Sequence, residues 1–329
     1  MTGLEKSTTS LPAEECYKSS VSSFDKTPAA KLGLIALIVG AAAIALAPIF
    51  VRLSELGPSA TGFHRMFLAL PLLWVWARSD GRRASDSHTT PAKMMPTRAQ
   101  WPLVILVGLF FAGDMAVWHW SIRLTSVANA TLLANFAPIF VALGAAVWLK
   151  EEITRQFMIA LVIALAGTVM VLGASHDMGE RHLLGDLLGI LTAVFYAAYI
   201  LAVKQVRQTI ATGTLMFWSA MISATALLPI AIISSEGLIA NTLYGWVILG
   251  GLAIFSHCGG QGLITYALAH LPAAFSSLTL LLQPVIAAFL AWMLLAEPLG
   301  GLQAAGGSVV LAGILLASRS SLPKSARRA

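Results

Sequence analysis

The sequence predicts an all-α membrane protein, and three observations lead to this prediction. First, 57% of the 329 residues are hydrophobic and only 11% are charged, with a mean hydropathy of +0.80. Soluble domains carry about 25% charged residues, so this chain has too little charge to cover a surface that faces water. Second, the apolar residues are gathered in long runs. Third, a pattern of proline and glutamate recurs in both halves of the chain.

Ten apolar runs are long enough to cross a bilayer as helices. A spanning helix needs about 20 mostly apolar residues, and its backbone polar groups must be paired within the segment because lipid offers no partners. The runs cover about 32–52, 59–77, 101–120, 126–149, 156–174, 184–203, 212–234, 245–267, 272–295 and 300–318. Most connections are short, and the exception is the polar loop over 78–100. We therefore expect ten transmembrane helices.

The distribution of Lys and Arg predicts that both termini are cytoplasmic. With the N-terminus inside, 17 of the 21 basic residues fall on the cytoplasmic side. Only Arg52, Arg123 and Arg181 fall outside, and Arg65 lies within the second helix. Cytoplasmic loops carry an excess of Lys and Arg, which fixes this orientation. The first apolar run is too long and starts too far along the chain for a cleavable signal peptide.

The fourth and ninth predicted helices carry the same pattern. In "ANFAPIFVALGAAVWLKEE", Pro138 precedes Glu151 by 13 positions, and in "LLLQPVIAAFLAWMLLAEP", Pro284 precedes Glu297 by the same distance. Each proline removes a backbone donor and is expected to kink its helix. The kink has either a packing role or a shared role in gating. Each glutamate stands where its helix meets water, as a solvated cap or in a short salt bridge.

The offset of 146 between these copies extends to their neighbours, since it pairs Gly167 with Gly313 and Ala160 with Gly306. The expected organisation is a disordered cytoplasmic tail (1–31), a first five-helix repeat (32–174), a second five-helix repeat (184–318) and a basic cytoplasmic tail (319–329). Because five is odd, the second copy enters the membrane from the opposite side. Such inverted-topology repeats occur in many secondary transporters, with the substrate site near the midplane where the repeats meet.

The two copies, "ANATLLANFAPIFVALGAAVWLKEEIT" and "AAFSSLTLLLQPVIAAFLAWMLLAEPL", resemble the EamA-type members of the drug/metabolite transporter superfamily. The segments "HRMFLALPLL" and "GDLLGILTAVFYAAYILAVKQV" fit as well, so the resemblance covers about 32–318. Glu152 and Pro298 depart from the pattern. The resemblance implies that helices 1, 3, 4, 6, 8 and 9 line a central cavity and that helices 5 and 10 support it. Small residues in helices 5 and 10 suit close packing of their backbones.

Asp114, in "FFAGDMAVWHW", is the clearest functional candidate inside the membrane. A charge at the bilayer centre costs about 2.5–3.5 kcal/mol on insertion scales, so such residues need a reason. Asp114 either binds a substrate amine or carries a coupling proton, or it forms a structural ion pair with Arg65, or it reaches the interface. Trp118, one turn further along the helix, is the aromatic candidate for contact with the solute.

Four polar residues complete the candidate site. Asn135 in the fourth helix and Gln283 in the ninth offer amide donors and acceptors. His257 and Gln261 in the eighth helix lie four positions apart on one face, and the histidine could relay protons. Each residue has an equally good structural interpretation as a hydrogen-bond partner between helices.

No motif in the sequence points to catalysis or to a cofactor. There is no G-x-x-x-x-G-K-[ST] for nucleotide binding and no H-E-x-x-H or G-x-S-x-G. The two cysteines, Cys16 and Cys258, lie far apart, and His257 has no second ligand at metal spacing. We therefore expect neither an enzyme, nor a bound metal, nor a nucleic-acid partner.

The sequence-based hypothesis is a multi-pass secondary transporter of the plasma (inner) membrane that works by alternating access. The resemblance implies amino acids or related compounds as substrates, moved outward. Proton coupling and a homodimer remain open. One alternative is uptake or exchange of nucleotide-like or methylated metabolites. Another is a membrane enzyme or a non-transporting subunit, for which the sequence shows no reactive cluster or large soluble domain.

Overall fold

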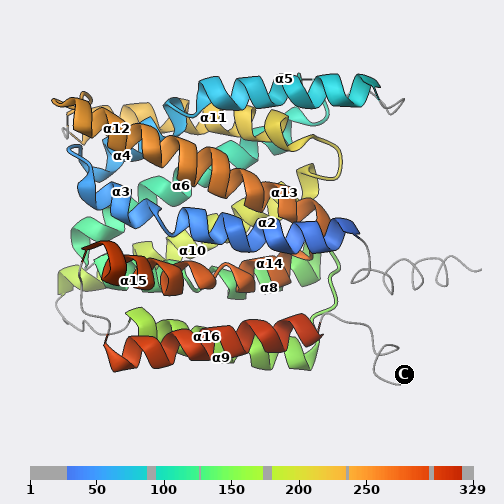
Figure 1. The fold of residues 1–329 in the computed structure, drawn as a ribbon, viewed down its shortest axis with the longest axis vertical. Coiled ribbons are helices and arrows are strands. Elements are labelled where there is room, and N and C mark those ends of the chain that lie inside the picture. Colours follow the sequence, from blue (N-terminus) through green and yellow to red (C-terminus); the bar gives the residue numbers. More distant parts are fainter. Residues whose placement is uncertain are drawn as a thin grey trace, which may run out of the picture.

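The computed structural model describes residues 28–86, 94–125, 127–172, 180–234, 237–295 and 300–320. Within these ranges every regular element is a helix, and Figure 1 shows the helices side by side with their axes nearly parallel. Nine of the described helical segments are long and apolar enough to cross a membrane. The protein is therefore an all-α membrane protein. Glu297 and most of the two tails lie outside the described residues.

The helices follow the order that the sequence predicts. The first half contains α2 (Pro28–Ile44), α3 (Ala47–Leu53), α4 (Pro58–Phe67), α5 (Leu70–Asp86), α6 (Trp101–Leu124), α7 (Val127–Ala134), α8 (Ala137–Trp148) and α9 (Arg155–Leu172). The second half contains α10 (Glu180–Val206), α11 (Thr212–Ile233), α12 (Leu243–Gly251), the π-helix η1 (Leu252–Gln261), α13 (Gly262–His270), α14 (Ala273–Thr279), α15 (Leu282–Leu295) and α16 (Gly301–Ser320). The start of α2 and the end of α16 lie at the same end of the bundle (Figure 1).

The second predicted span, 59–77, is built from two shorter helices. α4 has 10 residues and α5 has 17, so neither reaches the length of the nine apolar helices by itself. The count of ten spans therefore stays a prediction. α5 also runs on to Asp86, into the part of the chain expected to be a loop. The guanidinium of Arg78 lies 4.1 Å from the ring centroid of Trp74 one turn earlier, a contact that favours the longer helix.

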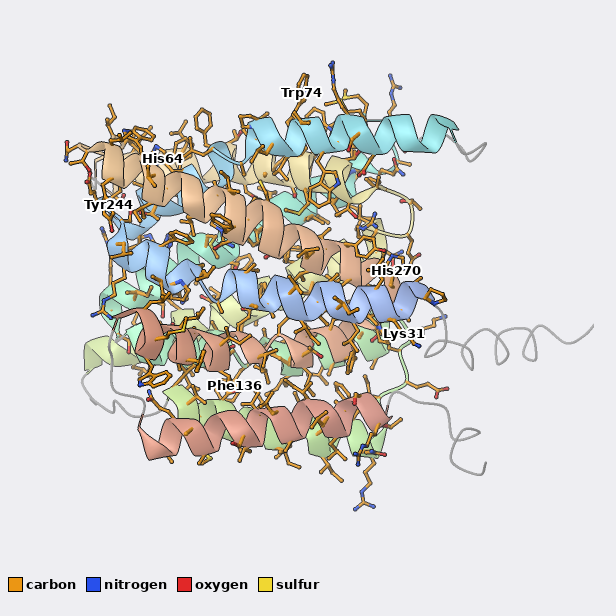
Figure 2. All side chains as sticks on the ribbon, in the orientation of Figure 1. Lys31, His64, Trp74, Phe136, Tyr244 and His270 are labelled. Atoms are coloured by element: carbon orange, nitrogen blue, oxygen red, sulfur yellow. The ribbon has the colours of Figure 1, made fainter. Side chains whose placement is uncertain are left out.

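Both prolines of the repeated pattern stand at helix interruptions. α8 begins one residue before Pro138, and α15 begins two residues before Pro284. Because proline has no amide hydrogen, the carbonyl one turn earlier loses its usual donor. Hydrogen bonds of tighter turns replace the missing ones; for example, the Gln283 amide donates to the Leu280 carbonyl at 2.9 Å. Phe136, at the first interruption, lies about halfway between the two ends of the bundle (Figure 2).

Helices α9 and α16 form a closely packed pair at one edge of the bundle (Figure 1). We call their contact the α9–α16 seam, and it consists of Ala160, Gly167, Gly306 and Gly313. A Cβ on Gly167 would lie 2.7 Å from the Gly306 carbonyl oxygen, and a Cβ on Gly313 would lie 2.9 Å from the Ala160 oxygen. Only residues with little or no side chain allow this approach.

The seam is symmetric under the 146-residue offset found in the sequence. That offset turns Gly167 into Gly313 and Gly306 into Ala160. The Gly167–Gly306 contact therefore maps onto the Gly313–Ala160 contact, and both contacts are present. Two copies that exchange their contacts in this way are related by a local two-fold axis, as in an isologous interface. This is the packing that an inverted repeat produces.

Candidate functional site

Polar side chains from both halves of the chain meet in the interior of the bundle. We call this group the central cluster, and it comprises Arg65 of α4, Phe111 and Asp114 of α6, Tyr196 and Tyr199 of α10, His257 and Gln261 of η1, and Gln283 of α15. Five of the seven candidate site residues from the sequence are among them: Arg65, Asp114, His257, Gln261 and Gln283. The cluster thus joins the two repeats.

Arg65 lies in the interior of the bundle, two turns after the start of α4. Gly57 and Pro58 start the helix, since proline is pre-organised for the first helical turn. Two turns later Arg65 is buried, with 8% of its surface exposed. Its guanidinium carbon lies 5.9 Å from the ring centroid of Phe111. Among the described residues, Arg65 makes no hydrogen bond and no ion pair, and its Nε is enclosed without an acceptor.

Asp114 lies on the same turn of α6 as Phe111 and is 5% exposed. It interacts electrostatically with Arg65. In the described chain, however, no carboxylate oxygen of Asp114 comes within 4.0 Å of an Arg65 nitrogen, and Asp114 accepts no hydrogen bond. The structural ion pair is therefore not formed in this conformation. The two residues are thus near enough to interact electrostatically without being in contact.

Aromatic side chains from both repeats lie beside Arg65 and Asp114. The Phe111 ring lies 4.9 Å from Tyr199, which stacks on Tyr196 at 6.2 Å. Gln261 Nε2 donates to the Tyr199 hydroxyl at 2.9 Å. The Tyr196 hydroxyl lies near the Gln283 side chain, whose Nε2 is enclosed and has no acceptor among the described residues. Amphipathic side chains thus surround the charges.

His257 lies on the other side of Phe111, with its ring centroid 5.7 Å away. It is 2% exposed, and neither ring nitrogen has a hydrogen-bond partner among the described residues. His257 and Gln261 belong to η1, and π-helical segments are rare and frequently occur at functional sites. In the described chain the histidine thus makes no hydrogen bond to another helix, and its role stays a prediction.

Two candidates from the sequence do not reach the cluster through the contacts seen here. Asn135 Nδ2 donates to the Thr131 carbonyl of its own helix at 2.7 Å, next to the interruption before Pro138. Trp118 is half-buried, and its ring lies 5.4 Å from that of His119. Their roles in solute contact remain predictions.

His119 is a buried polar residue that the sequence analysis did not single out. It is 4% exposed, its Nδ1 has no hydrogen-bond partner in the part of the chain that the structure describes, and Arg65 lies near enough to act on it electrostatically. The ring packs against α4, where a Cβ on Gly62 would lie 2.7 Å from its Cε1. His119 directly follows Trp118, so it does not lie on the face of α6 that Asp114 and Trp118 share, and it was not predicted.

A carboxylate joins the two repeats at the end of the bundle that holds Lys31 and His270 (Figure 2). Glu151 accepts hydrogen bonds from the Ala273 and Ala274 amides, at 2.7 and 3.1 Å. These are the first amides of α14, where a negative charge is favoured. Its expected role as a helix cap is thus seen, although it caps a helix of the other repeat.

A second carboxylate joins the two repeats near Tyr244, at the opposite end of the bundle (Figure 2). Glu55, between α3 and α4, accepts from the Asn241 amide at 2.9 Å and from the Thr242 amide at 3.2 Å. The Thr242 hydroxyl also donates to it, and this bond is the main reason that the pKa of Glu55 lies below its usual value. Thr242 is the N-cap of α12, so Glu55 ties the first repeat to the eighth predicted span.

The described residues contain no group of three or more His, Cys, Asp or Glu side chains that could hold a metal ion. Among the central cluster, only Asp114 and His257 belong to these residue types. The arrangement instead offers one cation, one anion and several neutral donors, which is suited to binding a polar solute.

Comparison with known proteins agrees with this architecture. The sequence matches the EamA-like transporter family over residues 31–173 and again over 183–319. The "Pseudopaline exporter CntI" of Pseudomonas aeruginosa is 26% identical over 219 residues, which cover 66% of this chain and 75% of that protein. A Streptantibioticus cattleyicolor protein named "Probable terminal-alkyne amino-acid exporter" is 25% identical over 235 residues, covering 69% of this chain and 76% of its own.

The same fold occurs in a solved crystal structure with 18% sequence identity. The two structures superpose with a TM-score of 0.69, over 89% of this chain and 97% of the other. An "Uncharacterized transporter" of Archaeoglobus fulgidus, 24% identical over 290 residues, spans 88% of this chain and 97% of that protein. The family match covers both halves of the sequence, as the resemblance predicted. The chain belongs to the EamA-like transporter family.

Proposed function

We propose that this protein is a secondary transporter that exports small amphipathic metabolites, amino acids or related compounds, across the plasma membrane. The observation that carries the proposal is the central cluster, in which Arg65 and Asp114 of the first repeat face His257 and Gln261 of the second. A solute bound there would touch both repeats, so rocking one repeat against the other would expose it to each side in turn. Two relatives are named as exporters, which supports the direction.

Alternating access also needs contacts that open at one end while the other end stays closed. Glu151 and Glu55 supply one such contact at each end, and each joins the two repeats. Each contact is a few hydrogen bonds between a carboxylate and a helix start, worth about 0.5–2 kcal/mol, so it can open and close readily. We assign these two residues to gating, together with the interrupted helices at Pro138 and Pro284.

Asp114 and His257 are the residues proposed to handle charge or protons during transport. Gln261 and Gln283 are proposed to contact the solute directly, since each presents an amide to the cluster. Asp114→Asn removes the charge and keeps the shape of the side chain. Under this proposal it changes both the rate of transport and its pH dependence.

Reconstitution into proteoliposomes tests the function. The liposomes are loaded with a panel of labelled amino acids, a labelled nucleotide and a labelled sulfonium compound, and release is followed with and without an imposed proton gradient. Release of amino acids that depends on the protein supports the proposal. Counterflow of the nucleotide or the sulfonium compound alone would favour the uptake or exchange reading. Movement of no solute in either direction would contradict a transport function.

A further inference from the structure

We propose that Lys150 is a positioning residue for the gate at Glu151. Its left-handed backbone directs the Glu151 carboxylate to the first amides of α14, and the strain of that backbone makes the closed gate easier to open. We call the hydrogen bonds of Glu151 to α14 the Glu151 contact. This role rests on the proposed transport function, in which the Glu151 contact closes one end of the bundle.

Lys150 has a backbone conformation that residues other than glycine rarely adopt. Its φ is 55°, and among the described residues it is the only one besides glycine with a positive φ. In this left-handed region the Cβ lies too close to the following carbonyl oxygen, so the conformation is strained. Helices often end with a left-handed residue, and that residue is usually glycine. The backbone at this position therefore suits glycine better than lysine.

The turn at Lys150 determines where the chain goes after α8. The Glu151 amide donates back to the Ala145 carbonyl at 3.0 Å, which ties the backbone of Glu151 to the last turn of the helix. The carboxylate of the same residue reaches the Ala273 and Ala274 amides. A right-handed or extended conformation at Lys150 would redirect the chain, and the carboxylate would leave these amides. The strained backbone thus belongs to the closed gate.

The side chain of Lys150 does not account for this strain. It is exposed, and it makes no hydrogen bond or ion pair in the part of the chain that the structure describes. A strained conformation persists only where the surrounding structure holds it. Here the bonds made by Glu151, to Ala145 and to α14, hold it in place. When the Glu151 contact opens, Lys150 is free to relax, and the strain that it loses favours the open state.

In the described chain, the hydrogen bonds between α14 and the first repeat come from Glu151. The hydroxyl groups of α14 donate to carbonyls of that helix or of the residue before it; they belong to Ser276, Ser277 and Thr279. Lys204 also holds this junction, but its bond to the Leu271 carbonyl, at 2.8 Å, stays within the second repeat. A small change in the energy of Lys150 should therefore shift the opening of this end directly.

Substitutions at Lys150 that differ in their tolerance of the left-handed region test this role. Glycine adopts that region without strain, and asparagine adopts it more readily than most residues. Alanine keeps the strain of lysine but removes its charge, and valine is the least tolerant because its Cβ is branched. The readout is the rate of maleimide labelling of Ala274→Cys, a buried position at the Glu151 contact. The full-length protein is used in nanodiscs, with Cys16 and Cys258 replaced by serine.

The labelling rates should follow the left-handed tolerance and not the charge. We expect Lys150→Gly to slow labelling roughly threefold to tenfold, because the closed state loses its strain. Lys150→Asn should slow it less, Lys150→Ala should leave it near the wild-type rate, and Lys150→Val should accelerate it. Equal slowing by the glycine and alanine variants would assign the effect to the lost charge and overturn the proposal. The same rate in all four variants would overturn it as well.

A double-variant cycle shows whether Lys150 acts through Glu151. In protein that carries Glu151→Ala the contact is already lost, so adding Lys150→Gly should change the labelling rate less than twofold. A change as large as in the wild-type background would show that Lys150 acts on the loop independently of Glu151, and it would overturn the positioning role. If Lys150→Val does not fold, the comparison of glycine with alanine still decides.

Transport in proteoliposomes separates this inference from the proposed function, because labelling needs no solute. Labelling rates that follow the expected order, with no movement of any member of the solute panel, would support the positioning of Glu151 by Lys150 and contradict the transport function. Protein-dependent release of a solute, with labelling rates that do not change across the variants, would support transport and overturn the role of Lys150.

Discussion

In the α9–α16 seam, the backbones of two helices touch, whereas in the central cluster large polar side chains meet and several of their atoms have no partner. Gly167 and Gly306 let the seam close to within contact of backbone atoms. Arg65 and His257, equally buried, have no hydrogen bonds in the described chain. The seam therefore gains stability from packing, whereas the enclosed polar atoms of the central cluster that lack a partner among the described residues lower its stability. Changes to the two regions should affect the protein in opposite ways.

The largest effect is expected from filling the seam. Gly167→Leu would place side-chain atoms where a Cβ alone already lies 2.6 Å from the Val310 amide nitrogen. Helix backbones cannot give way as a flexible side chain can, so we expect a loss of at least about 3 kcal/mol of stability and little folded protein. Thermal unfolding and size-exclusion profiles in detergent measure this.

The matched control is Gly250→Leu in α12. A Cβ at Gly250 meets no atom within 4 Å, so the same added side chain should leave the melting temperature nearly unchanged. If both variants lose the same stability, the added leucine side chain by itself, and not the close approach of α9 and α16, would explain the loss.

The next largest effect should have the opposite sign for stability. His257→Phe keeps a flat ring beside Phe111 and removes two ring nitrogens that have no partner in the described chain. An unsatisfied buried polar group costs about 1–3 kcal/mol, so we expect the variant to unfold at a higher temperature. Protein-dependent release of labelled amino acids from proteoliposomes should fall several-fold.

His64→Phe is the control for this prediction. His64 Nδ1 is already bonded to the Ala60 carbonyl at 2.9 Å, and its ring packs against Trp246 outside the central cluster. Its replacement should lower the melting temperature slightly and leave transport unchanged. A gain of stability in both variants would mean that any buried histidine is costly here, and the contrast with the seam would lose its basis.

A smaller effect is expected at the ends of the bundle, where the two repeats meet through carboxylates. Glu151→Ala removes the cap of α14, worth about 1 kcal/mol, and should raise the open population of that end roughly fivefold. A cysteine at Ala274, which is buried beneath this cap, reports opening through its rate of maleimide labelling once Cys16 and Cys258 are replaced by serine.

Glu152→Ala is the matched control, since Glu152 is the adjacent acid and is exposed. It should leave the labelling rate at Ala274→Cys unchanged. Equal acceleration by both variants would point to the net charge of the loop, and no acceleration by Glu151→Ala would exclude this residue from gating.

The small residues of the seam could be predicted from the sequence, because they recur at a fixed offset, but the sequence did not show which of them touch. Gly167, Gly313, Ala160 and Gly306 were paired by position alone, and the packing needs nothing but their lack of side chains. Small residues at helical spacing, which can be read from the sequence, show where two helix backbones are able to approach closely.

The central cluster could be predicted only in part. Rare charges in apolar runs marked Arg65 and Asp114, since lipid makes such residues costly. The separation of the two charges depends on how α4 and α6 sit in three dimensions, which no spacing along the chain reveals. The side-chain amide of Asn135 donates to the Thr131 carbonyl one turn earlier in the same helix, a local alternative to interhelical contact that the sequence does not settle.

The smallest effect is expected at Glu55, and it should depend on pH. Hydrogen bonds from Thr242 and its neighbours favour the charged form, so the pKa of Glu55 in the folded protein lies below its ordinary value of 4.5. A carboxylate with a lowered pKa stabilises the fold above its unfolded pKa, and this contribution is lost as the pH falls through the folded pKa. Glu55→Gln should therefore melt slightly lower than wild type at pH 7, and the difference should vanish as the pH is lowered below 4.5. A difference that persists in acid would assign the effect of Glu55 to hydrogen-bond geometry instead of charge. In that case the contact between Glu55 and the start of α12 would close its end of the bundle independently of pH.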